Sequence, residues 1–233
     1  MQSDIDYIFP PPPQPFVRIK NDGRLFAVRR IFCVGRNYAD HAREMGHDPD
    51  RELPFFFYKP SDALVEDGAN LPYPPQTKDL QHEVELVVAI GEGGVDIASE
   101  HALQHVFGYG VGIDLTRRDL QQEAKDKRRP WDWGKGFDRS APCSALAKAS
   151  TIGHPSHGRI HLSVNGQKRQ EGDLAHMIWP VADVIAFISR SMQLAVGDLI
   201  YTGTPAGVAS VLAGDRLTAG IDGVADLAVS ITE

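Results

Sequence analysis

Short apolar runs, bounded by glycine, proline or charged residues, recur along the chain. Residues 31–34 (IFCV) predict a short buried strand, and the longer runs at 83–90 and 106–113 predict two more. Glycines inside the 106–113 run indicate bends or close backbone approach. In 83–90 the residues Val87, Val88 and Ala89 continue without apolar–polar alternation, which favours a strand buried in the core.

The C-terminal third alternates short strands with turn signals. Residues 160–164 predict a strand that Asn165-Gly166 turns into a hairpin. Further short strands are expected at 199–201 and 227–231.

Three segments have helical character. Residues 37–45 predict a helix ended by Gly46, and residues 181–192 predict another. A third is expected over 116–127, with Thr116 as N-cap and Asp119 completing a capping box. Many short strands and few helices predict a β-rich α+β fold.

A length of 233 residues predicts one domain with a sizeable core. Prolines 10–13 and Pro15 predict a stiff, extended lead-in over residues 1–16, so the ordered domain is expected to begin near Val17 and to cover 17–233. Cys33 and Cys143 form no CxxC pattern and are expected to be reduced and structural.

Composition narrows the partners and the location. Hydrophobic residues make up 42% of the chain, no run approaches the length of a membrane span, and the first residues lack a signal-peptide pattern, so we expect a soluble cytoplasmic protein. A net charge of −7 argues against nucleic acid. The one basic cluster, residues 125–129, is interpreted as a solvated helix end.

Two carboxylates, Glu83 and Glu85, stand two residues apart in the apolar 83–90 run. A strand places them on one face, where burial and mutual repulsion require a compensating cation. Asp114, after the 106–113 run, offers a third oxygen ligand. Three carboxylates favour Mg²⁺ or Mn²⁺ over zinc. The alternatives are a solvent-facing pair and an Asp114 that bonds the amides of the next turn.

Other candidates carry less specific patterns. His41 and Glu44 are one helical turn apart, so the carboxylate can orient the imidazole as a base for water, or the two can be an ordinary exposed pair. Lys135 lies between glycines and near tryptophans, which suits an amine facing a pocket, although a surface-loop lysine fits too. The turn-rich loop 201–208 can hold a carboxylate.

The motifs GRNYADHAREMG, FFFYKPSDA, QHEVELVVAIG, GIDLTRRDLQ, WGKGFDRSAP and YTGTPAGV occur in this order. With them the sequence resembles the fumarylacetoacetate hydrolase family, in particular its short single-domain acylpyruvase branch of bacterial fumarylpyruvate hydrolases. The resemblance extends from about residue 28 to the C-terminus. It implies a mixed β-roll with peripheral helices, a homodimer, and one Mg²⁺ or Mn²⁺ held by Glu83, Glu85 and Asp114.

The resemblance also implies roles for individual residues. His41 and Glu44, on a lid helix, would activate water, and Lys135 would stabilise the enolate that is released. Substrate contacts are expected from a further set: Arg36, Tyr38, Lys59, Arg118, Gln121 and Thr204. A fumaryl group would need a cation for its second carboxylate, such as Arg43 or Arg118.

The implied reaction is metal-dependent hydrolysis of a C–C bond in a 2,4-dioxo acid, with fumarylpyruvate yielding fumarate and pyruvate as the first expectation. Hydrolysis of another acylpyruvate, oxaloacetate decarboxylation and isomerisation of a dienedioate are alternatives on the same site. A non-catalytic, metal-stabilised binding protein is the alternative of another class.

Overall fold

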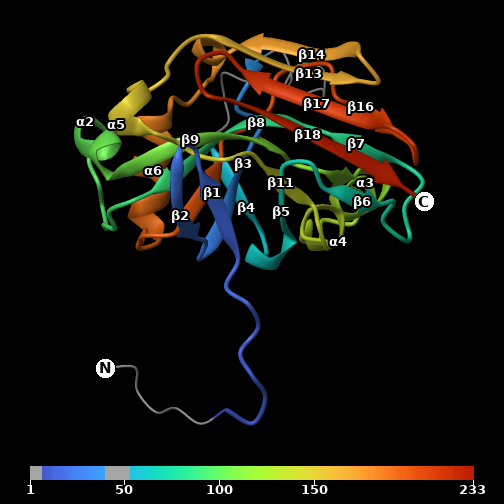
Figure 1. Ribbon diagram of the computed structural model, residues 1–233, viewed down its shortest axis with the longest axis horizontal. Coiled ribbons are helices and arrows are strands. Elements are labelled where there is room, and N and C mark those ends of the chain that lie inside the picture. Colours follow the sequence, from blue (N-terminus) through green and yellow to red (C-terminus); the bar gives the residue numbers. More distant parts are fainter. Residues whose placement is uncertain (1–6, 40–52) are drawn as a thin grey trace.

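The computed structural model describes residues 7–39 and 53–233. Its largest sheet has the strand order β4-β3-β15-β8-β9-β11-β5, with β12 beside β9 (Figure 1). The pairs β3/β15 and β5/β11 are parallel and the others antiparallel, so the sheet is mixed. Its strands are β3 (Arg30–Gly35), β4 (Phe55–Lys59), β5 (Leu64–Glu66), β8 (Val84–Ile90), β9 (Val106–Ile113), β11 (Ala141–Cys143), β12 (Ala147–Lys148) and β15 (Asp198–Tyr201).

Smaller sheets surround this one. A second sheet has the order β14-β13-β17-β18-β6, a third β10-β7-β16, and β1 pairs with β2. These strands are β1 (Phe16–Ile19), β2 (Asp22–Ala27), β6 (Asn70–Pro72), β7 (Leu80–His82), β10 (Thr116–Arg117), β13 (Arg159–Val164), β14 (Gln167–Asp173), β16 (Ala209–Val211), β17 (Arg216–Ile221) and β18 (Ala225–Thr232).

Helices lie at the periphery, as Figure 1 shows. The α-helices of the described residues are α2 (Ser99–Ala102), α3 (Arg118–Asp126), α4 (Asp132–Lys135), α5 (Ala149–Ile152) and α6 (Val181–Ser191); the 3-10 turns are η1 (Ser61–Ala63), η2 (Leu103–His105) and η3 (Leu174–His176). The β-rich α+β fold expected from the sequence is confirmed. None of these helices combines the length and apolar character needed to cross a bilayer.

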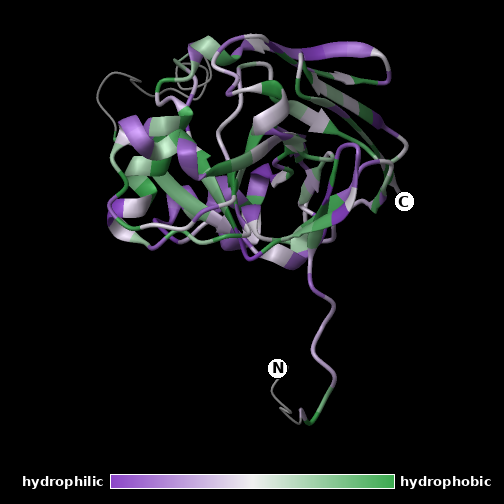
Figure 2. Ribbon diagram, turned by 60° about the vertical axis from the view of Figure 1, so that its left-hand side comes forward, coloured by the Kyte–Doolittle hydropathy of each residue, from purple (hydrophilic) through white to green (hydrophobic). Residues whose placement is uncertain are grey.

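The central strands are buried on both faces, which explains their lack of alternation. In β8, Leu86 and Val88 pack into one apolar cluster with the five-stranded sheet, whereas Val87 and Ala89 pack into another with β1 and β2. Figure 2 shows these inner strands as mainly hydrophobic and the outer strand of the β13–β14 hairpin as hydrophilic.

The local predictions can be compared with these elements. Asn165 and Gly166 have φ of 51° and 78°, as a hairpin turn of type I′ requires. The predicted helix at 181–192 is α6, whose Val181, Val184 and Ile188 form a buried stripe. Cys33 and Cys143 are free and buried.

Two predicted helix starts differ from the structure. Thr116 does not cap a helix: it pairs with Gln81 in β10, and α3 begins only at Arg118. Asp119 instead accepts bonds from the Thr77 hydroxyl and the Lys78 amide. In the segment predicted as helix 37–45, Asn37 and Tyr38 are not helical, and residues 40–45 lie outside the described residues.

Candidate active site

Three acidic residues lie together where the start of β8 is opposite the end of β9. Glu83 separates β7 from β8, Glu85 is the second residue of β8, and Asp114 follows the last residue of β9. Because β8 and β9 are antiparallel with Val84 opposite Ile113, these positions are adjacent. Each residue offers a carboxylate oxygen within 4.8 Å of those of the other two.

The exposed-pair interpretation of Glu83 and Glu85 is wrong, because the three residues are 6%, 1% and 0% exposed in the order Glu83, Glu85, Asp114. Converging carboxylate oxygens, without cysteine or histidine, are the donors that Mg²⁺ and Mn²⁺ prefer. The triad is therefore able to bind a divalent metal ion. It is the one such group of acidic, histidine or cysteine side chains among the described residues.

Two buried lysines contact carboxylates of the triad. Lys135, at the end of α4, donates from Nζ to Glu83 Oε2 (2.9 Å), Asp114 Oδ2 (2.7 Å) and the Thr116 hydroxyl (2.7 Å). Lys59, at the end of β4, forms an ion pair of 2.8 Å with Asp114 Oδ1. The surface-lysine interpretation of Lys135 and the turn-bonding interpretation of Asp114 are therefore wrong.

Arg118 and the Gly203 amide complete the surroundings of the triad. Arg118 bonds Glu83 Oε1 and also donates to Gln81 Oε1 at 2.7 Å. Glu85 accepts the Gly203 N–H at 2.7 Å. Among the described residues Glu83 and Asp114 each meet two cations, whereas Glu85 forms no ion pair.

This arrangement shifts the protonation equilibria. Burial, then repulsion from Asp114 and Glu83, raises the pKa of Glu85 well above its ordinary value. Burial opposes the charged form of Lys135, but Asp114 and Glu83 outweigh it and raise the pKa of this lysine. Lys135 is thus protonated in the metal-free site, and Glu85 is the carboxylate of the triad that lacks a cation partner among the described residues.

A cavity of about 30 Å³ is lined by Glu83 and Glu85, with Asp114 buried behind them. Of the residues predicted to contact substrate, Arg36, Arg118, Gln121 and Thr204 line it. Lys59 is not in the lining, and its ammonium is directed to Asp114 and to the Leu115 and Lys135 carbonyls. The aromatic walls are Phe55, Phe57 and Trp131.

Tyr38 lies apart from this cavity. It lines a neighbouring hollow of about 580 Å³ together with Glu171, Asp173 and Pro205. Its buried hydroxyl has no hydrogen-bond partner among the described residues, and burial followed by Glu85 raises its pKa.

Gln170 connects the 201–208 loop to the acidic strand, a role that no local sequence signal indicated. Its Nε2 donates to Thr204 Oγ1 and to the Pro205 carbonyl, both at 2.8 Å. Its Oε1 accepts the Val84 amide at 3.1 Å and contacts His82 Nδ1 at 2.9 Å. The loop is thereby tied to the start of β8, next to Glu83.

The predicted water-activating pair, His41 and Glu44, lies outside the described residues, as does Arg43. The basic cluster at 125–129 is only partly a solvated helix end, because Lys125 lines the cavity beside Arg118.

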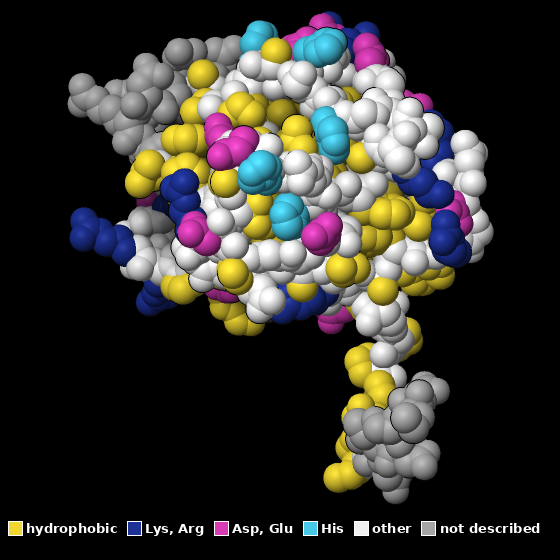
Figure 3. All heavy atoms as spheres, turned by 90° about the vertical axis from the view of Figure 1, so that its left-hand side faces the viewer, with side chains coloured by type: hydrophobic (Ala, Val, Ile, Leu, Met, Phe, Trp, Pro, Cys, Tyr) yellow, Lys and Arg dark blue, Asp and Glu magenta, His cyan; other side chains and the backbone are white. Residues whose placement is uncertain are grey.

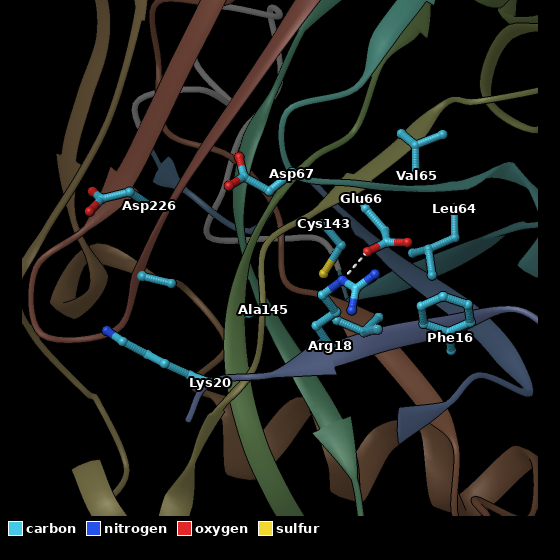
Figure 4. Close-up of a pocket in the computed structure, with 12 residues that line it drawn as sticks. Phe16, Arg18, Lys20, Leu64, Val65, Glu66, Asp67, Cys143, Ala145 and Asp226 are labelled. Atoms are coloured by element: carbon cyan, nitrogen blue, oxygen red, sulfur yellow. Dashed lines mark hydrogen bonds and ion pairs between the residues drawn. The ribbon is translucent and has the colours of Figure 1, made fainter. Parts of the chain in front are cut away.

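Another hollow, of about 380 Å³, lies between β1, β5 and the start of β18 (Figure 4). Arg18 and Glu66 form an ion pair in it, and Lys20, Asp67 and Asp226 project from its walls (Figure 4). Within the described residues its acidic groups do not converge as a metal site would require. The triad cavity is therefore the candidate active site.

The surface on the side of α2, α5 and α6 mixes histidine, acidic and apolar side chains (Figure 3). Lysine and arginine side chains lie mainly toward the rim of this view (Figure 3). The face shown there lacks the continuous basic stripe of a phosphate-backbone site.

The family model described as fumarylacetoacetate hydrolase C-terminal matches residues 30–232. The chain belongs to this family. It is 41% identical over 189 residues to fumarylpyruvate hydrolase of a Ralstonia species, covering 80% of this chain and 98% of the relative. It is 42% identical over 199 residues to the mitochondrial oxaloacetate tautomerase of Mus musculus, covering 85% and 90%.

A solved structure of another family member agrees closely with the fold. Fumarylpyruvate hydrolase from Pseudomonas aeruginosa, in complex with Mn²⁺ and pyruvate, superposes with a TM-score of 0.96 at 49% identity. The match covers 97% of this chain and 99% of that one. The resemblance inferred from the sequence motifs is confirmed, as is the divalent cofactor expected of the triad.

Proposed function

We propose that the protein is a divalent-metal-dependent acylpyruvate hydrolase that cleaves fumarylpyruvate to fumarate and pyruvate. The observation that carries the proposal is the buried triad of Glu83, Glu85 and Asp114 with Lys135 bonded into it. The relative and the solved structure named fumarylpyruvate hydrolase support the choice of substrate.

The reaction adds water to the carbonyl at C4 of the 2,4-dioxo acid. The C3–C4 bond then breaks, its electron pair passes into the pyruvate half as an enolate, and the acyl half leaves as a carboxylic acid that loses its proton. Protonation at C3 completes pyruvate. The barrier is lowered most where negative charge develops, on the pyruvate oxygens.

The described residues suit this charge distribution. A divalent ion on the triad, when bound, supplies positive charge for the oxygens of the 2-oxo acid. Lys135 donates to both Glu83 and Asp114, so its ammonium would add positive charge beside the enolate. Lys59 positions Asp114 through their buried ion pair. Thr204, held by Gln170, and Arg36 would orient the substrate carboxylate.

We further assign the activation of water to His41, oriented by Glu44. A carboxylate bonded to one ring nitrogen leaves the other nitrogen free to accept a proton. Both residues belong to GRNYADHAREMG, one of the motifs that carry the resemblance to the family.

The test is pyruvate release from fumarylpyruvate, acetylpyruvate and oxaloacetate, with Mn²⁺, with Mg²⁺ and with EDTA. Metal-dependent turnover fastest on fumarylpyruvate, reduced at least about a hundredfold by His41→Ala, is expected for a general base. An enzyme equally active in EDTA, or a His41→Ala variant with unchanged turnover, would refute the proposal.

A second candidate is chemistry on oxaloacetate, favoured by the 42% identity to an oxaloacetate tautomerase. Tautomerisation needs proton transfer at C3 but no attack by water. Faster interconversion of the enol and keto forms of oxaloacetate, followed by ultraviolet absorbance without pyruvate release and retained by His41→Ala, would select it.

We also propose a homodimer, a cytoplasmic location, a role in the breakdown of aromatic compounds, and a single catalytic domain over 17–233 preceded by a proline-rich lead-in. Light scattering tests the dimer, and deletion of residues 1–16 without loss of turnover tests the domain boundary.

A further inference from the structure

Helix α3 presents one polar stripe to the active-site cavity. Arg118, Gln121 and Lys125 follow one another at intervals of three and four residues, so they share a face. All three line the cavity. Lys125 lies about 6 Å further along the helix axis than Gln121, away from the triad end that Arg118 contacts.

The other cavity cations already have acidic partners or other contacts. Lys135 is bonded to Glu83 and Asp114, and Arg118 is bonded to Glu83, Gln81 and Gln121. The Arg36 guanidinium lies 5.3 Å from the Phe55 ring centroid. Arg118 and Lys135 are therefore held at the triad end of the cavity.

Lys125 differs from them. Its ammonium lies 5.2 Å from the centroid of the Trp131 ring, and it has no carboxylate partner among the described residues. Burial, followed by the charges of Arg118 and Arg36, lowers its pKa to about 8. A half-buried cation placed next to other cations is electrostatically unfavourable until an anion joins it.

We propose that Lys125 is a specificity-determining residue that binds the distal carboxylate of a dicarboxylic acylpyruvate whose 2-oxo acid end lies at the triad. The inference rests on the proposed function. It assigns this carboxylate to Lys125 rather than to Arg118, because Arg118 is engaged by Glu83 at the opposite end of the stripe. Trp131 excludes water beside the ammonium and so strengthens the ion pair.

The experiment compares two substrates that differ at the distal end, fumarylpyruvate and acetylpyruvate, in the Mn²⁺-loaded full-length protein. The variants are Lys125→Gln, Lys125→Arg and the control Lys127→Gln. Lys127 follows the same helix but is exposed and paired with Glu123. Titration of fumarate into the Mn²⁺-loaded protein, followed by calorimetry, measures carboxylate binding without turnover.

Lys125→Gln is expected to lower kcat/KM for fumarylpyruvate by about 10- to 100-fold, mainly through KM, because a charge-assisted hydrogen bond is lost. The loss on acetylpyruvate should be far smaller, Lys125→Arg should recover part of it, and Lys127→Gln should match wild type. Fumarate should bind Lys125→Gln at least about tenfold more weakly than wild type.

Equal losses on both substrates, or an unchanged kcat/KM and fumarate affinity in Lys125→Gln, would overturn the inference. If the wild-type protein hydrolyses only acetylpyruvate, the inference on Lys125 is overturned, whereas the assignment as an acylpyruvate hydrolase stands. Wild type inactive on both would refute the proposed function instead, and the fumarate titration would still decide the role of Lys125.

Discussion

Glu85→Gln should stabilise the metal-free protein and at the same time abolish its stabilisation by Mn²⁺. Glu85 is 1% exposed and accepts a hydrogen bond from the Gly203 amide at 2.7 Å. Glutamine has the same shape and can accept that bond with its carbonyl oxygen. The substitution therefore removes charge from the triad with little change in packing.

The magnitude follows from the charges around Glu85. At 4.8 Å, the limit within which the triad oxygens lie, two like charges repel by about 3.5 kcal/mol at an effective dielectric constant of 20. Glu85 faces two such neighbours, partly offset by Lys135. Protonation limits the penalty, because a carboxyl ordinarily titrating at 4.5 costs at most about 3.4 kcal/mol to protonate at pH 7.

The stability gained by Glu85→Gln depends on pH. A folded-state pKa raised above the unfolded value means that the contribution of Glu85 is fully present below pH 4.5 and is lost as pH rises through the folded value. The gain from Glu85→Gln should therefore be near zero at pH 4.5 and grow as the pH rises, up to the limit of about 3 kcal/mol at neutral pH that protonation sets.

Urea unfolding in EDTA at several pH values measures this gain, and repetition with Mn²⁺ measures the metal's contribution. Wild type should gain about 2.7 kcal/mol when Mn²⁺ is at 100 times its dissociation constant, and Glu85→Gln should gain little. Glu92→Gln, at an exposed turn residue, is the control. A Glu85→Gln variant less stable than wild type in EDTA at neutral pH would refute the reasoning.

Three further predictions concern the same site. Lys59→Met should cost about 3–5 kcal/mol in urea unfolding, because it breaks a buried ion pair; an unchanged midpoint would contradict this. Gly203→Ala should weaken Mn²⁺ binding about tenfold or more by calorimetry, because φ is +93° and the new Cβ would lie 2.7 Å from the Cβ of Asn37. Gly214→Ala is its control, because Gly214 has a φ of +94° but open space around it. In wild type, kcat/KM for fumarylpyruvate should fall above about pH 8 as Lys125, near Arg36, Arg118 and Lys135, loses its proton, and Lys125→Arg should move that fall upward.

Local sequence patterns predicted the central strands and the β13–β14 hairpin turn, but not most of the shorter or outer strands. Apolar runs specified β3, β8 and β9 because burial on both faces leaves little room for polar residues, and Asn165-Gly166 specified its turn because few residues adopt positive φ. The predicted start of α3 at Thr116 was wrong, because the Thr116 hydroxyl bonds Lys135 and Glu83 instead of capping a helix. A tertiary contact overrode a local signal there.

The sequence by itself determined the candidate ligands, because Glu83 and Glu85 stand two apart in an apolar run and Asp114 ends the next run. The antiparallel pairing of β8 with β9 brings the three carboxylates together. Only the tertiary structure decided which cations meet them. Lys59, Arg118 and Lys135 come from β4, α3 and α4, Gln170 from β14, and each reaches the triad or its loop through strand pairing and helix placement. Such contacts join residues far apart along the chain, so no periodicity or motif encodes their distance or burial, and these set the charge of the site.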